Sequence, residues 1–130
     1  MAIKRKILAV DDDPTIRMLV SQILSSEGYE VILAENGARG LETLSQVQFT
    51  DDLFLILLDV MMPEMTGLEV LTQVKDKNLA PTVPVIMLTA EARTEDILTG
   101  YNKGADYYIT KPFTRLQLMH GISLATQEPE

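Results

Sequence analysis

The sequence contains no cysteine and a single histidine in 130 residues. Disulfide bonds and thiolate metal sites are therefore excluded. Any metal site in this chain must use mainly oxygen ligands, which argues against zinc. The absence of cysteine also fits a cytoplasmic location, which we expect for this protein.

Long apolar runs are missing as well. The longest continuous one, Leu53–Leu58, is far too short to cross a bilayer. The basic start Lys4–Lys6 is followed by an apolar stretch that stops at Asp11, which is too short for a signal peptide. We therefore expect no membrane association.

Basic residues are scarce, since 11 Lys and Arg face 19 Asp and Glu, giving a formal net charge of −8. Such an acidic surface repels phosphate backbones, so we expect no direct binding to nucleic acid. The acidity could serve solubility alone, or part of it could form a cation site. The positions of the aspartates decide between these two interpretations.

Five short apolar runs alternate with segments of helical periodicity. Continuous rather than alternating apolar character indicates strands that are covered on both faces, as in a parallel sheet. The pattern predicts one α/β domain over residues 1–130, with residues 126–130 as a tail or a linker to an output domain. The expected strands are Ile7–Val10, Val31–Ala34, Leu53–Leu58, Val85–Leu88 and Tyr107–Ile109.

The first expected helix has clear boundaries. Apolar residues at helical spacing run from Ile16 to Leu24. Asp13 suits the N-cap, Pro14 the first helical position and Gly28 the stop. The other four helices are marked by Leu41–Val47, Leu68–Val74, Ile97–Tyr101 and Leu116–Ile122. Gly121 lies inside the last of these, so we expect that helix to be weakened.

Polar residues close the predicted strands. Asp11 and Asp12 follow the first strand, Asp59 the third and Thr89 the fourth, and Lys111 comes after the fifth. In open α/β sheets ligands bind beyond the carboxyl ends of the strands. If the first and third strands are neighbours, the three aspartates converge and require a cation, for which Mg²⁺ or Mn²⁺ is suited. A nearby hydroxyl and ammonium would complete a phosphoryl site.

Four segments make a specific resemblance to response-regulator receiver domains. They are Ile7–Pro14, Leu57–Gly67, Met87–Ala90 and Gly104–Phe113, in the order and at roughly the spacing of that family. The resemblance covers nearly the whole chain. It implies a flavodoxin-like, doubly wound (βα)5 fold whose five-stranded parallel sheet has the strand order 2-1-3-4-5.

The resemblance also implies the chemistry. Asp59 would be the phosphoacceptor and would attack the phosphorus of a phosphohistidine. Asp11, Asp12, an Asp59 oxygen and the main-chain carbonyl of Met61 would hold Mg²⁺. The phosphoryl donor would be a sensor histidine kinase or a histidine phosphotransfer protein. In this interpretation the domain is a signalling module that catalyses only its own phosphorylation and dephosphorylation.

A second set of residues would bind the phosphoryl group and switch the domain. Lys111 would pair with a phosphoryl oxygen and Thr89, followed by Ala90, would move to bind it. Tyr108 would then turn inward. The surface of the fourth helix, the fifth strand and the fifth helix would change. It would serve an effector, an output domain or a second copy of the chain.

Further roles follow from position in the four segments. Pro63, Gly67 and Pro112 are expected to be structural, and the family's Lys-Pro bond before Pro112 is cis. Met61 and Glu91 would tune the lifetime of the phosphoryl group. The sequence departs from the family at several places, among them Gly100, where Ala is common.

Other interpretations remain open at this point. Asp11 to Thr15 also fits the D-x-D-x-T start of haloacid-dehalogenase-type phosphatases, with Asp11 as nucleophile and Asp13 as acid/base. A flavodoxin-like binding module and a receiver that only binds partners are two further alternatives. Asp13 serves equally as a helix cap, and we assign no chemistry to His120.

Overall fold

The computed structural model describes residues 5–46, 52–90 and 94–127, and the side chains of residues 94–96 are not described. The strands are β1 (Lys6–Val10), β2 (Glu30–Ala34), β3 (Leu53–Asp59), β4 (Val85–Thr89) and β5 (Tyr107–Thr110). The helices are α1 (Pro14–Ser26), α2 (Gly37–Leu44), α4 (Gly67–Asp76), α5 (Thr94–Asn102) and α6 (Arg115–Thr126). Val47, expected in the second helix, and Glu91 lie outside the described residues.

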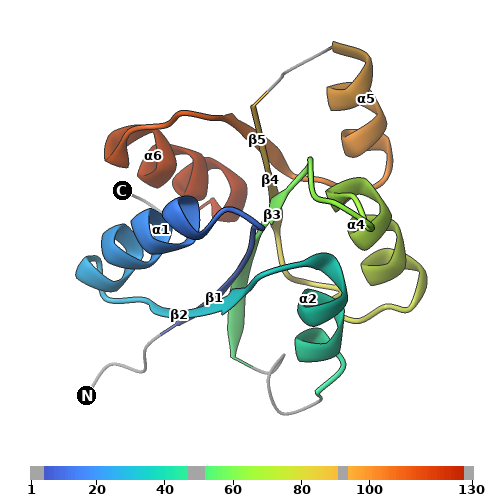
Figure 1. The fold of residues 1–130 in the computed structure, drawn as a ribbon, viewed down its shortest axis with the longest axis horizontal. Coiled ribbons are helices and arrows are strands. Elements are labelled where there is room, and N and C mark those ends of the chain that lie inside the picture. The colour runs from blue at the N-terminus through green and yellow to red at the C-terminus, as the bar shows by residue number, and fades with distance from the viewer. Residues whose placement is uncertain (1–4, 47–51, 91–93, 128–130) are drawn as a thin grey trace.

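The sheet has the predicted topology. Its order is β2-β1-β3-β4-β5, and every neighbouring pair is parallel. Figure 1 shows α1 and α6 on one side of the sheet and α2, α4 and α5 on the other. From β1 the chain adds β2 on one side, and it then adds β3, β4 and β5 in turn on the other side. The order of strand addition therefore reverses between β1 and β3. This reversal brings the carboxyl ends of these two strands side by side.

Each strand supplies side chains to two separate cores. Leu8 and Val10 of β1 join the cluster under α2 and α4, whereas Ile7 and Ala9 join the cluster under α1 and α6. The central strand β3 is divided in the same way. This alternation explains why the apolar runs are continuous, because both faces of each strand are covered.

The predicted start and end of the first helix are confirmed. The side chain of Asp13 accepts a hydrogen bond of 2.9 Å from the main-chain N–H of Thr15, and Pro14 occupies the first turn. Beyond the helix, Gly28 has a φ of 94°, a conformation that glycine adopts without strain.

Helix α6 runs unbroken through Gly121, so the glycine does not interrupt the helix. Gly121 is buried against β5. A Cβ atom at this position would lie 2.7 Å from Ile109 Cδ1 and 3.2 Å from Tyr107 Cε2. The glycine therefore lets helix and edge strand approach closely, and packing offsets its low helix propensity.

Among the described residues, no helix has the length and apolar character needed to cross a bilayer.

We predict that Gly121→Ala lowers the free energy of unfolding by about 1 kcal/mol. Overpacking of a filled site typically costs about 1–3 kcal/mol, which exceeds the gain of about 1 kcal/mol in helix propensity. Urea titration of both proteins measures the difference. Leu116→Ala in the same helix is the control, since Leu116 is 75% exposed and should change little. Stabilisation by Gly121→Ala would contradict the close packing.

Candidate functional site

The alternation of side chains along the strands delivers three charged groups to one place. Asp11, Asp59 and Lys111 lie at the carboxyl ends of β1, β3 and β5 or just beyond them. The residues two positions earlier all belong to the cluster under α1 and α6: Ala9, Leu57 and Ile109. Since side chains repeat every second residue, the charged groups continue that face beyond the core.

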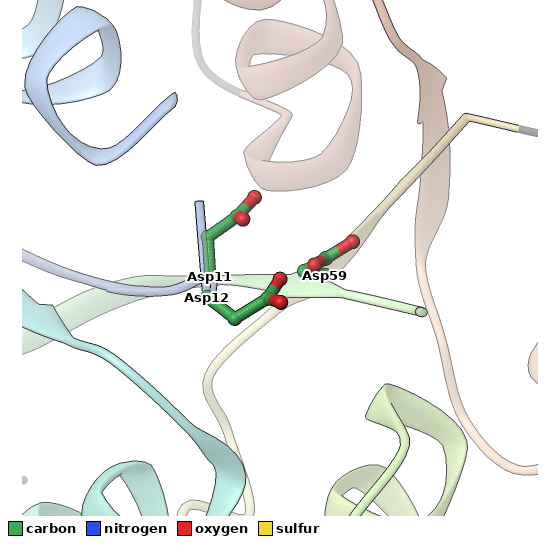
Figure 2. A group of neighbouring side chains, drawn as sticks. All are labelled: Asp11, Asp12 and Asp59. Atoms are coloured by element: carbon green, nitrogen blue, oxygen red, sulfur yellow. The ribbon is translucent and has the colours of Figure 1, made fainter. Parts of the chain in front are cut away.

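Three carboxylates gather at this edge of the sheet. Asp11, Asp12 and Asp59 each present an oxygen, and these oxygens all lie within 4.8 Å of one another. Figure 2 shows them side by side at the ends of β1 and β3. Asp11 is 2% exposed and Asp59 is 3% exposed, whereas Asp12 is exposed to solvent. Two of the three carboxylates are therefore removed from water. In the protein interior their mutual repulsion is poorly screened.

Lys111 lies between the two buried carboxylates. Its Nζ atom is 2.7 Å from Asp11 Oδ2 and 3.1 Å from Asp59 Oδ1. Burial alone would lower the pKa of Lys111, but its contacts with Asp11 and Asp59 outweigh burial and raise that pKa. The ammonium is therefore charged at neutral pH and neutralises part of the cluster.

Asp11 is fixed in place by its own loop and by α1. Its Oδ1 atom accepts a hydrogen bond of 2.9 Å from the main-chain N–H of Asp13, and its main-chain carbonyl accepts one of 2.8 Å from Arg17 Nη1. Its Oδ2 atom is buried and accepts no hydrogen bond from the described part of the chain, although the Lys111 ammonium lies close by. That oxygen has an unused lone pair beside the other carboxylates.

Sequence reasoning did not single out Arg17. Its position in the sequence could have indicated this contact. Arg17 comes six residues after Asp11, in the first turn of the following helix, from which a long side chain can reach back to the end of the strand.

The carboxyl group of Asp59 has a raised pKa. Its pKa is raised from 3.8 to about 7, mainly by burial and secondly by repulsion from Asp11, while Lys111 acts in the opposite direction. In the absence of a cation, the cluster therefore holds a proton near neutral pH. A divalent cation would replace that proton and restore the carboxylate.

The donor set fits a divalent cation that prefers oxygen. Among the described residues, three carboxylates converge, one of them has a buried oxygen without a hydrogen bond, and their negative charge exceeds that of the Lys111 ammonium beside them. Mg²⁺ and Mn²⁺ prefer such ligands. The residues present are thus compatible with a divalent metal site.

The structure also places the remaining predicted residues. Thr89 is buried at the end of β4, and its carbonyl accepts a hydrogen bond of 2.7 Å from the Lys111 N–H. Ala90 follows it and is exposed. Tyr108 is half-buried on β5, opposite Met87 in the register of β4. The bond between Lys111 and Pro112 is cis, as the resemblance implied.

The loop after Asp59 packs tightly against the strand end. The main-chain N–H of Met61 donates to Asp59 Oδ1 over 3.4 Å, and the Met61 side chain is 68% exposed. The Gly67 N–H donates to the Val60 carbonyl over 2.9 Å, and a Cβ on Gly67 would collide with the main chain of Asp59. Gly67 therefore allows α4 to begin directly behind Asp59. Pro63 is exposed in the turn between them, and its carbonyl accepts a hydrogen bond of 2.7 Å from the Met65 N–H.

Comparison with known proteins agrees with this geometry. The family model of the response regulator receiver domain matches residues 7–123, and the chain belongs to that family. Phosphorylation by a kinase is the general function of its members.

The transcriptional regulatory protein DltR of Streptococcus agalactiae is 39% identical over 123 residues, which is 95% of this chain and 52% of that protein. The chemotaxis protein CheY4 of Vibrio cholerae superposes with a TM-score of 0.86 at 34% identity, over 95% of this chain and 99% of the other. A CheX–CheY–BeF3–Mg²⁺ complex from Borrelia burgdorferi gives a TM-score of 0.86 at 25% identity, over 93% of this chain and 88% of the matched one.

The chain spans about half the length of the curated relatives it matches. The matches give no support to the phosphatase alternative, because the family found over residues 7–123 is the receiver family. Asp13, the acid/base of that alternative, is instead engaged as the cap of α1.

We predict that Asp59→Asn stabilises the metal-free protein at pH 8 by roughly 1–4 kcal/mol, because each unit of pKa shift corresponds to about 1.4 kcal/mol and loss of the ion pair with Lys111 offsets part of the gain. The folded-state pKa of about 7 lies above the value of 3.8 for the unfolded chain. The folded protein therefore holds an extra proton between about pH 4 and pH 7, and its stability falls as the pH rises through that range. At pH 4 the substitution should give little gain.

Urea titrations with a chelator at both pH values make the measurement. Asp52→Asn removes the same charge from an exposed carboxylate and is the matched control. Equal effects of the two substitutions at pH 8 would show that the buried charge at Asp59 is not the destabilising group.

Proposed function

We propose that Asp59 accepts a phosphoryl group from a phosphohistidine, carried by a sensor histidine kinase or a histidine phosphotransfer protein. The observation that carries the proposal is the position of Asp59, a buried carboxylate between two further aspartates and a lysine ammonium. Membership of the receiver family supports it.

The chemistry requires a nucleophile and neutralisation of charge. An oxygen of the Asp59 carboxylate attacks phosphorus, the P–N bond to the imidazole breaks, and the electron pair of that bond leaves with the imidazole nitrogen. The product is an acyl phosphate on Asp59. Because the transferred group carries charge on three oxygens, positive groups around it supply most of the stabilisation.

Asp11, Asp12, Asp59 and the main-chain carbonyl of Met61 would hold Mg²⁺, or Mn²⁺ in its place. When bound, the cation offsets the charge of the carboxylates and of the phosphoryl oxygens. The similar Borrelia burgdorferi complex contains Mg²⁺ and BeF3. That similarity supports the metal assignment for this chain.

Lys111, Thr89 and Ala90 would bind the phosphoryl oxygens. The Lys111 ammonium already lies 3.1 Å from Asp59 Oδ1, and its main chain is tied to Thr89 by the hydrogen bond described above. Met61 has an exposed apolar side chain beside the acceptor and would shield the acyl phosphate from water, while Glu91 would orient that water. Met61 and Glu91 would thus set the lifetime of the phosphorylated form.

The face formed by α5, β5 and α6 would carry the output. Leu98, Tyr101 and Leu116 on its helices are exposed apolar side chains, and Tyr108 of β5 contacts Gly100 and Tyr101 of α5. Its partner would be an effector, an output domain or a second copy of the chain. Light scattering tests the last of these, and a monomer that is unchanged by phosphorylation argues against a dimer.

In this proposal the domain turns over no substrate other than its own phosphoryl group. It works in the cytoplasm, where ATP supplies the phosphoryl group of the kinase.

We predict that incubation with acetyl phosphate and Mg²⁺ adds one phosphoryl group to the protein, as measured by intact mass. Asp59→Asn should remove the adduct because the nucleophile is gone. Asp11→Asn and chelation of the metal should each reduce it at least tenfold, as expected for loss of charge neutralisation at a phosphoryl site.

Asp106→Asn is the matched control, since the Asp106 carboxylate accepts a hydrogen bond from Val85 at the opposite end of β4. It should label like the unmodified sequence. An adduct that persists in Asp59→Asn would contradict the proposed acceptor.

A further inference from the structure

Gly100 lies on the inner side of α5 where the ring of Tyr108 packs. Gly100 is buried, and Tyr108 is half-buried against the core cluster under α2 and α4. Figure 1 shows α5 on that same side of the sheet. The helix and the edge strand therefore meet at these two residues.

While the Tyr108 ring holds this position, the contact leaves no room for a side chain at position 100. A Cβ atom there would lie 2.7 Å from Tyr108 Cζ and 2.9 Å from Cε1, and it would overlap the Tyr108 hydroxyl oxygen. Real Cβ atoms essentially never approach other atoms this closely. The end of the ring thus occupies the space that alanine, the smallest side chain, would need.

The ring of Tyr101 and the core cluster under α2 and α4 also pack against Tyr108. Tyr101, the next residue of α5, packs edge-on against Tyr108 with ring centroids 5.4 Å apart. In the register of the sheet, Tyr108 stands opposite Met87, which is fully buried. Since side chains alternate along β4, Met87 and Thr89 face the same side of the sheet. Tyr108 is therefore packed beside the strand that ends in Thr89.

We propose that Gly100 is a positioning residue for Tyr108: it forms a notch in α5 that admits the tyrosine hydroxyl and keeps the ring turned inward before any phosphoryl group is present. The domain then starts with a substantial population of the conformation that phosphorylation is expected to favour. Phosphorylation then requires a smaller conformational change at the α5–β5–α6 face than it would if the ring started outward.

The functional part of this inference rests on the proposed function. If the phosphorylated form prefers the inward ring, the affinity for a phosphoryl group scales with the fraction of molecules that already hold it. Gly100→Ala should lower that fraction. The apparent affinity for trifluoroberyllate with Mg²⁺ should then fall by roughly three- to tenfold.

The position of the ring is tested first, by NMR of the metal-free full chain. We expect cross-relaxation between the Tyr108 ring protons and the Gly100 Hα protons. In Gly100→Ala the contacts between the Tyr108 ring and the core cluster under α2 and α4 should weaken, and the ring resonances should shift towards exposed values. Leu98→Ala, at an exposed site on the same helix, is the control and should leave the ring in place.

Tyr108→Phe extends the test without adding volume. It removes the hydroxyl that fills the notch, so Gly100→Ala should reduce trifluoroberyllate affinity less in the Tyr108→Phe background than alone. This coupling would not arise if Gly100→Ala acted only by loosening the fold.

Two results would overturn the inference: no contact between the ring and Gly100 in the unmodified sequence, or a ring that stays against the core cluster under α2 and α4 in Gly100→Ala. Failure of the proposed function is separate, because the ring contacts are measured without metal or phosphoryl group. A chain that fails to take up any phosphoryl group would leave those contacts in place.

Discussion

The buried charge at the carboxyl edge of the sheet is the constraint on which the site depends. Two carboxylates, Asp11 and Asp59, share the ammonium of Lys111, and a third carboxylate lies beside them. Among the described residues, the Lys111 ammonium neutralises only part of the charge of these three carboxylates. Burial and repulsion keep a proton on the cluster near neutral pH, as the pKa of about 7 for Asp59 indicates. A divalent cation would offset that negative charge and leave the Asp59 carboxylate free to accept a phosphoryl group, which is why the cluster suits a switch.

The fold builds this cluster by simple rules of parallel sheets. The strand order places β1 beside β3, and two-residue alternation brings the charged side chains to one face. Close approach of the main chain completes the arrangement, since Gly67 lets α4 start against the carbonyl of Asp59. Stability and function are therefore in tension at Asp59, because the burial that prepares its carboxylate also destabilises the metal-free fold.

The strands, the helices and the charged residues of the site could be predicted from the sequence, because they depend on local patterns. Asp11, Asp59 and Lys111 each end or follow an apolar run, and the resemblance to receiver domains fixed the strand order. The roles of Gly100, Gly121 and Arg17 could not be predicted in the same way. Each depends on a distance between two elements, such as the approach of α5 to Tyr108 or of α6 to Ile109. For Gly121 the local rule is incomplete, because low helix propensity says nothing of what the glycine packs against.

Chemical trapping of the modified residue tests the central claim most directly. Borohydride reduces an acyl phosphate of aspartate to homoserine, and peptide mapping then locates it in the chain. After treatment with acetyl phosphate and Mg²⁺, the account predicts homoserine at position 59 alone. Homoserine at position 11, or a phosphoryl adduct that resists reduction, would contradict it.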